Sequence, residues 1–152
     1  MDIVFLDVDG VLNSQNKLIE LYNKTGKPHS GSNFPFDEKC LENLKILVKE
    51  TDAKIVITST LRKYERNMKV FLNKLKEYDL EKDVIGYTPI LNRKREEEII
   101  EYLNKLDIKV NFIIIDDIRD MESLNDRLVV TSPKTGFTEE NMKNAIKILK
   151  KG

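Results

Sequence analysis

The stretch of residues 3–13 constrains the fold of this chain more than any other part of its sequence. An uninterrupted apolar run, residues 3–6, leads directly into two aspartates, Asp7 and Asp9, and then into Gly10. A short run of this kind is typical of a strand that is buried on both faces of a parallel sheet, with helices on either side. Such sheets bind ligands beyond the carboxyl ends of their strands, where the two aspartates would lie. The glycine allows the chain to turn sharply away from that edge.

Two carboxylates this close together repel each other, and one of them tends to take up a proton unless a cation compensates. Mg²⁺ suits such a site, because it binds one or two carboxylates and otherwise keeps water and phosphate oxygens as ligands. The sequence therefore predicts a Mg²⁺ site at Asp7 and Asp9. The alternative is a solvated Asp-x-Asp-Gly turn, since this is a common turn composition.

The rest of the chain alternates between apolar runs and amphipathic segments. Further strands are expected at residues 53–57, 84–87, 112–115 and 128–130, and helices at 17–23, 37–51, 62–78, 96–106 and 138–150. This alternation predicts an α/β fold with three layers, Rossmann-like, around a mainly parallel sheet. We expect a single domain over residues 1–152, in which residues 14–36 form a flap-like insertion over the site. His29, the only histidine, falls in that insertion and is expected to be solvated.

Two more groups of polar residues follow predicted strands. Thr58, Ser59 and Thr60 come directly after the second strand, where their hydroxyls could bind phosphate oxygens or simply cap the next helix. Asp116 and Asp117 follow the strand at 112–115. Because parallel strands end at the same edge of a sheet, both acidic pairs could share one cation. A basic run at residues 93–95 precedes a predicted helix, where positive charge opposes the helix dipole; this indicates either a phosphate contact or a solvated surface.

The order of these motifs resembles the haloacid dehalogenase (HAD) superfamily of aspartate-nucleophile phosphohydrolases. The finer pattern is similar to the HAD domains of "Swiss Army Knife" RNA repair proteins. The supporting segments are residues 5–13, 36–37, 55–62, 95–99 and 115–117. Leu61 stands where that group is expected to carry tryptophan.

The resemblance implies a set of catalytic roles. Asp7 would attack phosphorus and form an aspartyl-phosphate. Asp9 would act as general acid and then as general base. The side chain of Asp7, the backbone carbonyl of Asp9, and Asp116 or Asp117 would bind Mg²⁺.

The resemblance also implies contacts with the phosphoryl group and the substrate. Ser59 would donate a hydrogen bond to a phosphoryl oxygen, and either Lys94 or Arg95 would neutralise the transferring group. Further substrate contacts are expected from Gly10, Thr60 and Arg62, and Asp120 is expected to orient ligands from behind the site.

Residues 14–36 and 61–93 are too short to hold the large cap domains that select small substrates in many HAD enzymes. An open site suits a large substrate such as a phosphorylated nucleic-acid end. Lys and Arg total 26, as do Asp and Glu, so the net charge is zero, which argues mildly against a polynucleotide as substrate.

Cys40 is the only cysteine, which excludes an internal disulfide and a cysteine-rich zinc site. The sequence shows no signal-peptide pattern and no apolar run long enough to span a membrane. We therefore expect a cytoplasmic protein with no membrane partner.

Three alternatives to a nucleic-acid-end phosphatase remain open at this point. A small-molecule phosphatase such as a nucleotidase would use the same residues. A catalytically silent HAD-like module would bind without reacting. A response-regulator-like receiver would carry its phosphorylated aspartate after the third strand, but this chain has Gly86, Tyr87 and Thr88 there.

Overall fold

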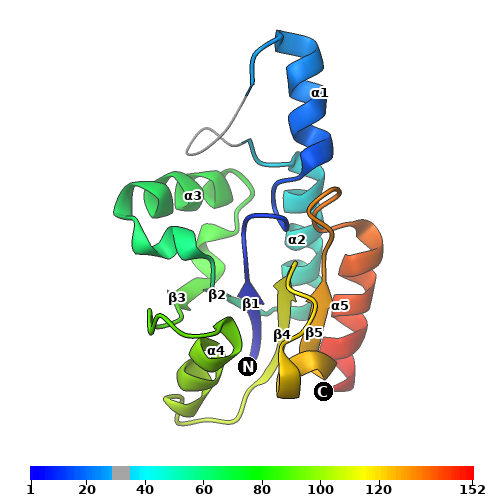
Figure 1. The fold of residues 1–152 in the computed structure, drawn as a ribbon. Helices are drawn as coiled ribbons and strands as arrows, with labels where there is room; N and C mark the ends of the chain where they lie inside the picture. Colours follow the sequence, from blue (N-terminus) through cyan, green and yellow to red (C-terminus); the bar gives the residue numbers. More distant parts are fainter. Residues whose placement is uncertain (29–34) are drawn as a thin grey trace.

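The computed structural model describes residues 1–28 and 35–152. At its centre lies a five-stranded sheet with the order β3-β2-β1-β4-β5 (Figure 1). Its strands are β1 (Asp2–Leu6), β2 (Lys54–Ile57), β3 (Val84–Tyr87), β4 (Asn111–Asp116) and β5 (Leu128–Val130). All four pairs of neighbouring strands are parallel, which confirms the predicted α/β class.

Helices cover both faces of the sheet. The covering helices are α2 (Glu38–Thr51), α3 (Glu65–Glu77), α4 (Arg95–Asn104) and α5 (Glu139–Lys151), with short 3₁₀ segments η2 (Thr60–Lys63), η3 (Glu81–Asp83) and η4 (Glu122–Arg127). A further helix, α1 (Gln15–Thr25), does not lie against the sheet. Side chains of α2, α3 and α5 join one buried apolar cluster, and those of α4 and η4 pack into the other. The result is the three-layer arrangement expected from the sequence.

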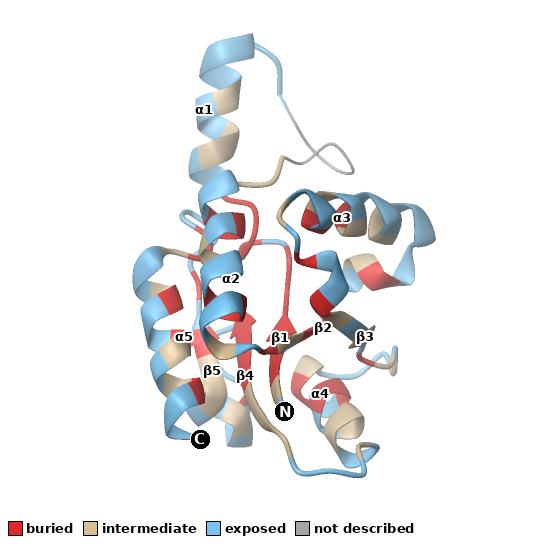
Figure 2. Cartoon of the chain, turned by 180° about the vertical axis from the view of Figure 1, so that it is seen from behind, coloured by how far each residue is buried: buried red, intermediate tan, exposed pale blue. Residues whose placement is uncertain are grey.

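The central strand β1 explains why residues 3–6 are continuously apolar. Val4 and Leu6 belong to the cluster under α2, α3 and α5, whereas Ile3 and Phe5 belong to the cluster under α4. All four side chains are fully buried, and the strand is coloured as buried in Figure 2. A strand covered on both faces needs apolar residues at every position rather than at alternate ones.

The helix predicted over residues 62–78 exists as α3, but its predicted start is wrong. The structure has the 3₁₀ segment η2, then an extended residue, Tyr64 (φ −122°, ψ 111°), and only then α3. The side chain of Arg62 turns back and donates to the carbonyls of Thr58 and Ser59, which fastens η2 to the end of β2. The helix predicted over residues 96–106 does exist, but it begins at Arg95 and ends at Asn104.

Helix α1 follows β1 after a short loop and stands out beyond the carboxyl edge of the sheet (Figure 1). Ser14 caps it by accepting a hydrogen bond from the backbone N–H of Lys17, and none of its residues is buried. The predicted flap over residues 14–36 remains a prediction, and His29 lies outside the described residues. No helix in the described part of the chain is both long and apolar enough to cross a bilayer.

Candidate active site

The register of the sheet brings polar residues together at its carboxyl edge. The N–H of Asp7 donates to the carbonyl of Ile115 on β4 (3.1 Å), and the N–H of Thr58 donates to the carbonyl of Leu6 on β1 (2.9 Å). Asp7 therefore lies between Thr58 on one side and Asp116 on the other. These three residues occupy the first position beyond β1, the first beyond β2 and the last of β4.

Three carboxylates form a compact cluster at this edge. Asp7, Asp116 and Asp117 each offer an oxygen, and these oxygens lie within 4.8 Å of one another. Carboxylate oxygens at such spacing suit a hard divalent cation such as Mg²⁺, so the donor set fits the predicted metal. The carboxylate of Asp9 is outside this cluster, and the prediction for Asp9 concerns its backbone carbonyl.

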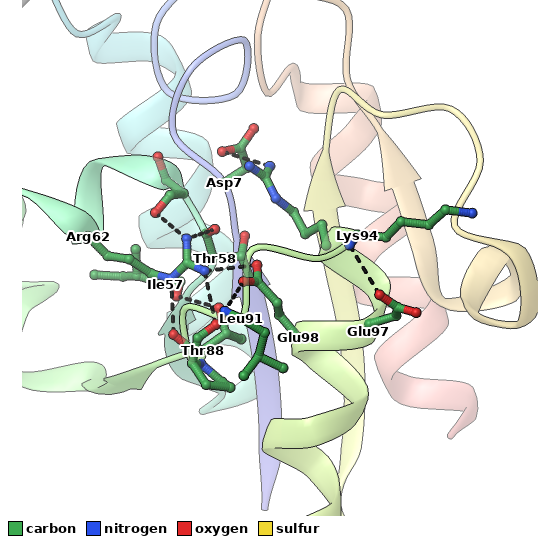
Figure 3. Close-up of polar contacts among 12 residues, drawn as sticks. Asp7, Ile57, Thr58, Arg62, Thr88, Leu91, Lys94, Glu97 and Glu98 are labelled. Carbon is green, nitrogen blue, oxygen red and sulfur yellow. Dashed lines mark hydrogen bonds and ion pairs between the residues drawn. The ribbon is translucent and has the colours of Figure 1, made fainter.

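Arg95 lies against two of these carboxylates. Its guanidinium is 3.1 Å from Asp7 Oδ1 and donates a 2.8 Å hydrogen bond to Asp116 Oδ2. Burial opposes its charge, but Asp7 and Asp116 more than offset this and raise the pKa of Arg95 above its usual value. Lys94 instead is exposed and pairs with Glu122 at 3.1 Å, and its side chain points away from Asp7 (Figure 3). Of the two basic residues predicted for the site, the structure brings only Arg95 to it.

Burial and neighbouring acids both raise pKa values in this cluster. Burial, together with the nearby charge of Asp116, raises the pKa of Asp7 to about 7, and Arg95 limits this rise. Burial and a hydrogen bond with Asp116 also raise the pKa of Asp117. With all three carboxylates ionised, the cluster would carry more negative charge than Arg95 alone compensates, so a further cation would favour their ionised forms.

The turn after Asp7 is fixed by Asn13. The Asn13 amide oxygen accepts from the N–H of Gly10 (2.9 Å), and its amide nitrogen donates to Asp9 Oδ1 (2.8 Å). Gly10 has a positive φ of 79°, and a Cβ built on it would lie 2.5 Å from Asp117 Oδ2. Gly10, predicted as a substrate contact, thus allows the turn and leaves room for Asp117. Asn13 was not among the predicted site residues, although its place in the turn is a signal for such a contact.

The three hydroxyl residues after β2 have different environments. The Ser59 hydroxyl accepts a 3.3 Å hydrogen bond from the N–H of Leu61 and so caps η2. Thr60 is exposed and lines a hollow beside Asp9. In the described ranges, Thr58 Oγ1 is the one buried side-chain nitrogen or oxygen without a hydrogen-bond partner. Thr58, next to Asp7 in the sheet, is thus a better candidate for the phosphoryl contact than the predicted Ser59; the signal was its position directly after the strand.

Arg62, predicted to contact substrate, is instead held inside the protein. Its side chain is 1% exposed. Its five N–H groups donate to Glu98 and to the backbone carbonyls of Thr58, Ser59, Thr88 and Pro89 (Figure 3). No donor remains for a ligand, because a guanidinium has five N–H groups in total. The correction is that Arg62 ties together the ends of β2 and β3.

Asp120 also differs from its predicted role behind the metal site. Its carboxylate is exposed and accepts hydrogen bonds from the N–H of Glu122 (2.9 Å) and from the side chain of Asn125 (2.8 Å). The bond from Asn125 is the main cause of a lowered pKa at Asp120. Asp120 therefore stabilises the turn into η4 and has no place in the carboxylate cluster.

A parallel sheet that ends in two acidic segments, with a basic residue from a later helix between them, defines this chain as a HAD-type protein. It belongs to the family of HAD domains in Swiss Army Knife RNA repair proteins, whose model matches residues 3–142. Comparisons with curated proteins and with solved structures returned no match. Membership in this family points to a hydrolase of the phosphohydrolase type.

Proposed function

We propose that this protein is a Mg²⁺-dependent phosphomonoesterase that works through an aspartyl-phosphate. The observation that carries the proposal is the position of Arg95, whose guanidinium bridges Asp7 and Asp116 at the ends of two adjacent strands. A nucleophilic carboxylate must approach a phosphoryl group that is itself negatively charged. A fixed guanidinium beside the carboxylate lowers the cost of bringing the two together.

In the first step, an Asp7 oxygen attacks phosphorus, and the bond from phosphorus to the leaving oxygen breaks. Asp9 donates its proton to that oxygen, so the alcohol departs neutral. In the second step, Asp9 takes a proton from water, the water oxygen attacks phosphorus, and the bond from phosphorus to Asp7 breaks. Inorganic phosphate is released and both carboxylates return to their starting forms. Asn13 supports this exchange because its amide holds the Asp9 carboxylate.

Asp7, Asp116 and Asp117 would hold the Mg²⁺ ion, with the backbone carbonyl of Asp9 as a further ligand. When bound, the ion supplies positive charge that reduces repulsion between the carboxylates and the phosphoryl group. Thr58 would donate its unpartnered hydroxyl to a phosphoryl oxygen, and Arg95 would neutralise another.

For the substrate, we propose phosphorylated nucleic-acid ends. The family description names RNA repair, and no folded cap lies between β1 and α2 in the described residues. A small-molecule phosphatase remains the second candidate, because the residues that would perform the chemistry are the same in both.

The test is phosphate release with Mg²⁺ or with EDTA. The substrates are an aryl phosphate, mononucleotides, and oligonucleotides phosphorylated at the 5′ or the 3′ end. The variants are Asp7→Asn and, as a matched control, Asp107→Asn, which changes an exposed aspartate before β4. We expect Mg²⁺-dependent release that only Asp7→Asn abolishes. No release from any substrate by the folded protein would contradict the proposal.

A further inference from the structure

A hollow of about 300 Å³ opens beside Asp9, between the turn after β1 and the segment η2–α3. Its lining includes Asp9, Asn13, Phe36, Thr60, Tyr64 and Asn67. Asp9 is the general acid of the proposed function, so the oxygen that it protonates must lie next to its carboxylate. The hollow is therefore where the leaving group of the phosphomonoester would lie.

The walls of this hollow carry aromatic rings. Phe36 stacks on Phe71 with ring centroids 5.9 Å apart and an interplanar angle of 27°. Tyr64 is 60% exposed and makes no side-chain capping hydrogen bond, although it stands at the start of α3. A large ring that remains mostly exposed at the mouth of a hollow is available to stack on a flat ligand.

The charge of the lining restricts what the leaving group can carry. Among the described residues that line the hollow, Asp9 is the only charged one. A leaving group with its own carboxylate would face Asp9 with no cation from this described lining to compensate, which is unfavourable. Neutral polar groups are provided by Asn13, Thr60 and Asn67, whose amides and hydroxyl both donate and accept hydrogen bonds.

We propose that this hollow binds a nucleoside as the leaving group, with its base stacked on Tyr64. This inference rests on the proposed function, because it assigns the leaving-group side through Asp9. A nucleoside is uncharged and has a flat, aromatic base, and it carries the hydroxyl and amide-like groups that the lining can pair. Base stacking on aromatic side chains tolerates every base, since each has a π-face. The nucleoside could belong to a free mononucleotide or to the terminal residue of a nucleic acid.

The experiment measures kcat/KM with Mg²⁺ for a nucleoside monophosphate, for glycerol 2-phosphate and for 3-phosphoglycerate. The quantity compared is the ratio of kcat/KM for the nucleotide to that for glycerol 2-phosphate. Variants are Tyr64→Ala and Tyr64→Phe. Tyr87→Ala is the control, because Tyr87 is equally exposed (59%) but lines a different hollow.

In the wild type we expect a ratio of at least about tenfold, with 3-phosphoglycerate the poorest substrate. Tyr64→Ala should lower the ratio about fivefold or more, the range seen when a stacked aromatic residue is removed. Tyr64→Phe, which keeps the ring, and Tyr87→Ala should leave the ratio within about twofold. Comparing mononucleotides with 5′- and 3′-phosphorylated oligonucleotides then identifies the source of the nucleoside.

The inference would be overturned by equal hydrolysis of nucleotide and glycerol 2-phosphate, or by a ratio that Tyr64→Ala leaves unchanged. Either result would leave the phosphatase proposal standing, because Mg²⁺-dependent release would still be seen. The absence of release from every substrate, including the aryl phosphate, would instead overturn both.

Discussion

Arg62 and Glu98 form an ion pair of 2.9 Å inside the protein, and their side chains are only 1% and 8% exposed. The second oxygen of Glu98 accepts from the N–H of Leu91 at 2.8 Å. The pair thus connects the end of β2, the loop after β3 and the first turn of α4. That turn carries Arg95, and the end of β2 carries Thr58, so one buried contact supports two candidate site residues.

We expect Glu98→Leu to destabilise the protein by about 3–5 kcal/mol, because it leaves a buried guanidinium without its counter-charge. The measurement is the free energy of unfolding from urea titration. Asp79→Asn, which removes the exposed ion pair between Lys82 and Asp79, is the control and should leave the urea midpoint unchanged. A Glu98→Leu protein as stable as the wild type would show that the pair is dispensable.

Arg95 and Lys94 are neighbours in sequence, and the structure predicts opposite results when each is replaced. Arg95→Ala should lower kcat by roughly 10²–10³-fold, as expected for removing a charged group that stabilises the transferring phosphoryl. Lys94→Ala should change kcat by less than about twofold, because it breaks only an exposed pair with Glu122. Steady-state kinetics on an aryl phosphate measures both. Equal losses in the two variants would contradict the assignment of Arg95.

The strands and both acidic segments could be predicted because their signals are local. An apolar run followed directly by aspartates identifies a strand and its end. Local sequence could not predict which of Lys94 and Arg95 reaches the carboxylate cluster, because this depends on where α4 begins and how it packs. The burial of Arg62 likewise depends on Glu98 and on the carbonyls of Thr88 and Pro89 after β3, which no spacing in the sequence reveals. On α2, the apolar residue Ile46 is 42% exposed, because the helix packs through its other apolar residues.

Thr58 and Ser59 should separate activity from stability. Thr58→Val keeps the shape of the side chain and removes a buried hydroxyl that has no partner, so stability should stay equal or rise. If that hydroxyl binds a phosphoryl oxygen, kcat/KM should fall by about tenfold or more. Ser59→Ala removes the cap of η2 and should cost about 0.5–1 kcal/mol of stability with little effect on kcat/KM. Urea titration measures the free energy of unfolding of each variant, and steady-state kinetics measures its kcat/KM. A loss of kcat/KM in Ser59→Ala but not in Thr58→Val would instead identify Ser59 as the phosphoryl contact.

Gly10 and Gly26 offer a matched test of the metal site. Both have positive φ, 79° and 70°, so replacing either with alanine costs about 1–2 kcal/mol of backbone strain. Within the described part of the chain, a Cβ at Gly26 meets nothing within 4 Å, whereas one at Gly10 would lie 2.5 Å from Asp117 Oδ2 and displace that carboxylate. We expect Mg²⁺ to raise the Tm of the wild type and of Gly26→Ala by the same amount, because a ligand that binds only the folded state stabilises it. In Gly10→Ala the increase should be largely lost. The measurement is Tm at increasing Mg²⁺ against EDTA, and an unchanged increase in Gly10→Ala would remove Asp117 from the proposed ligand set.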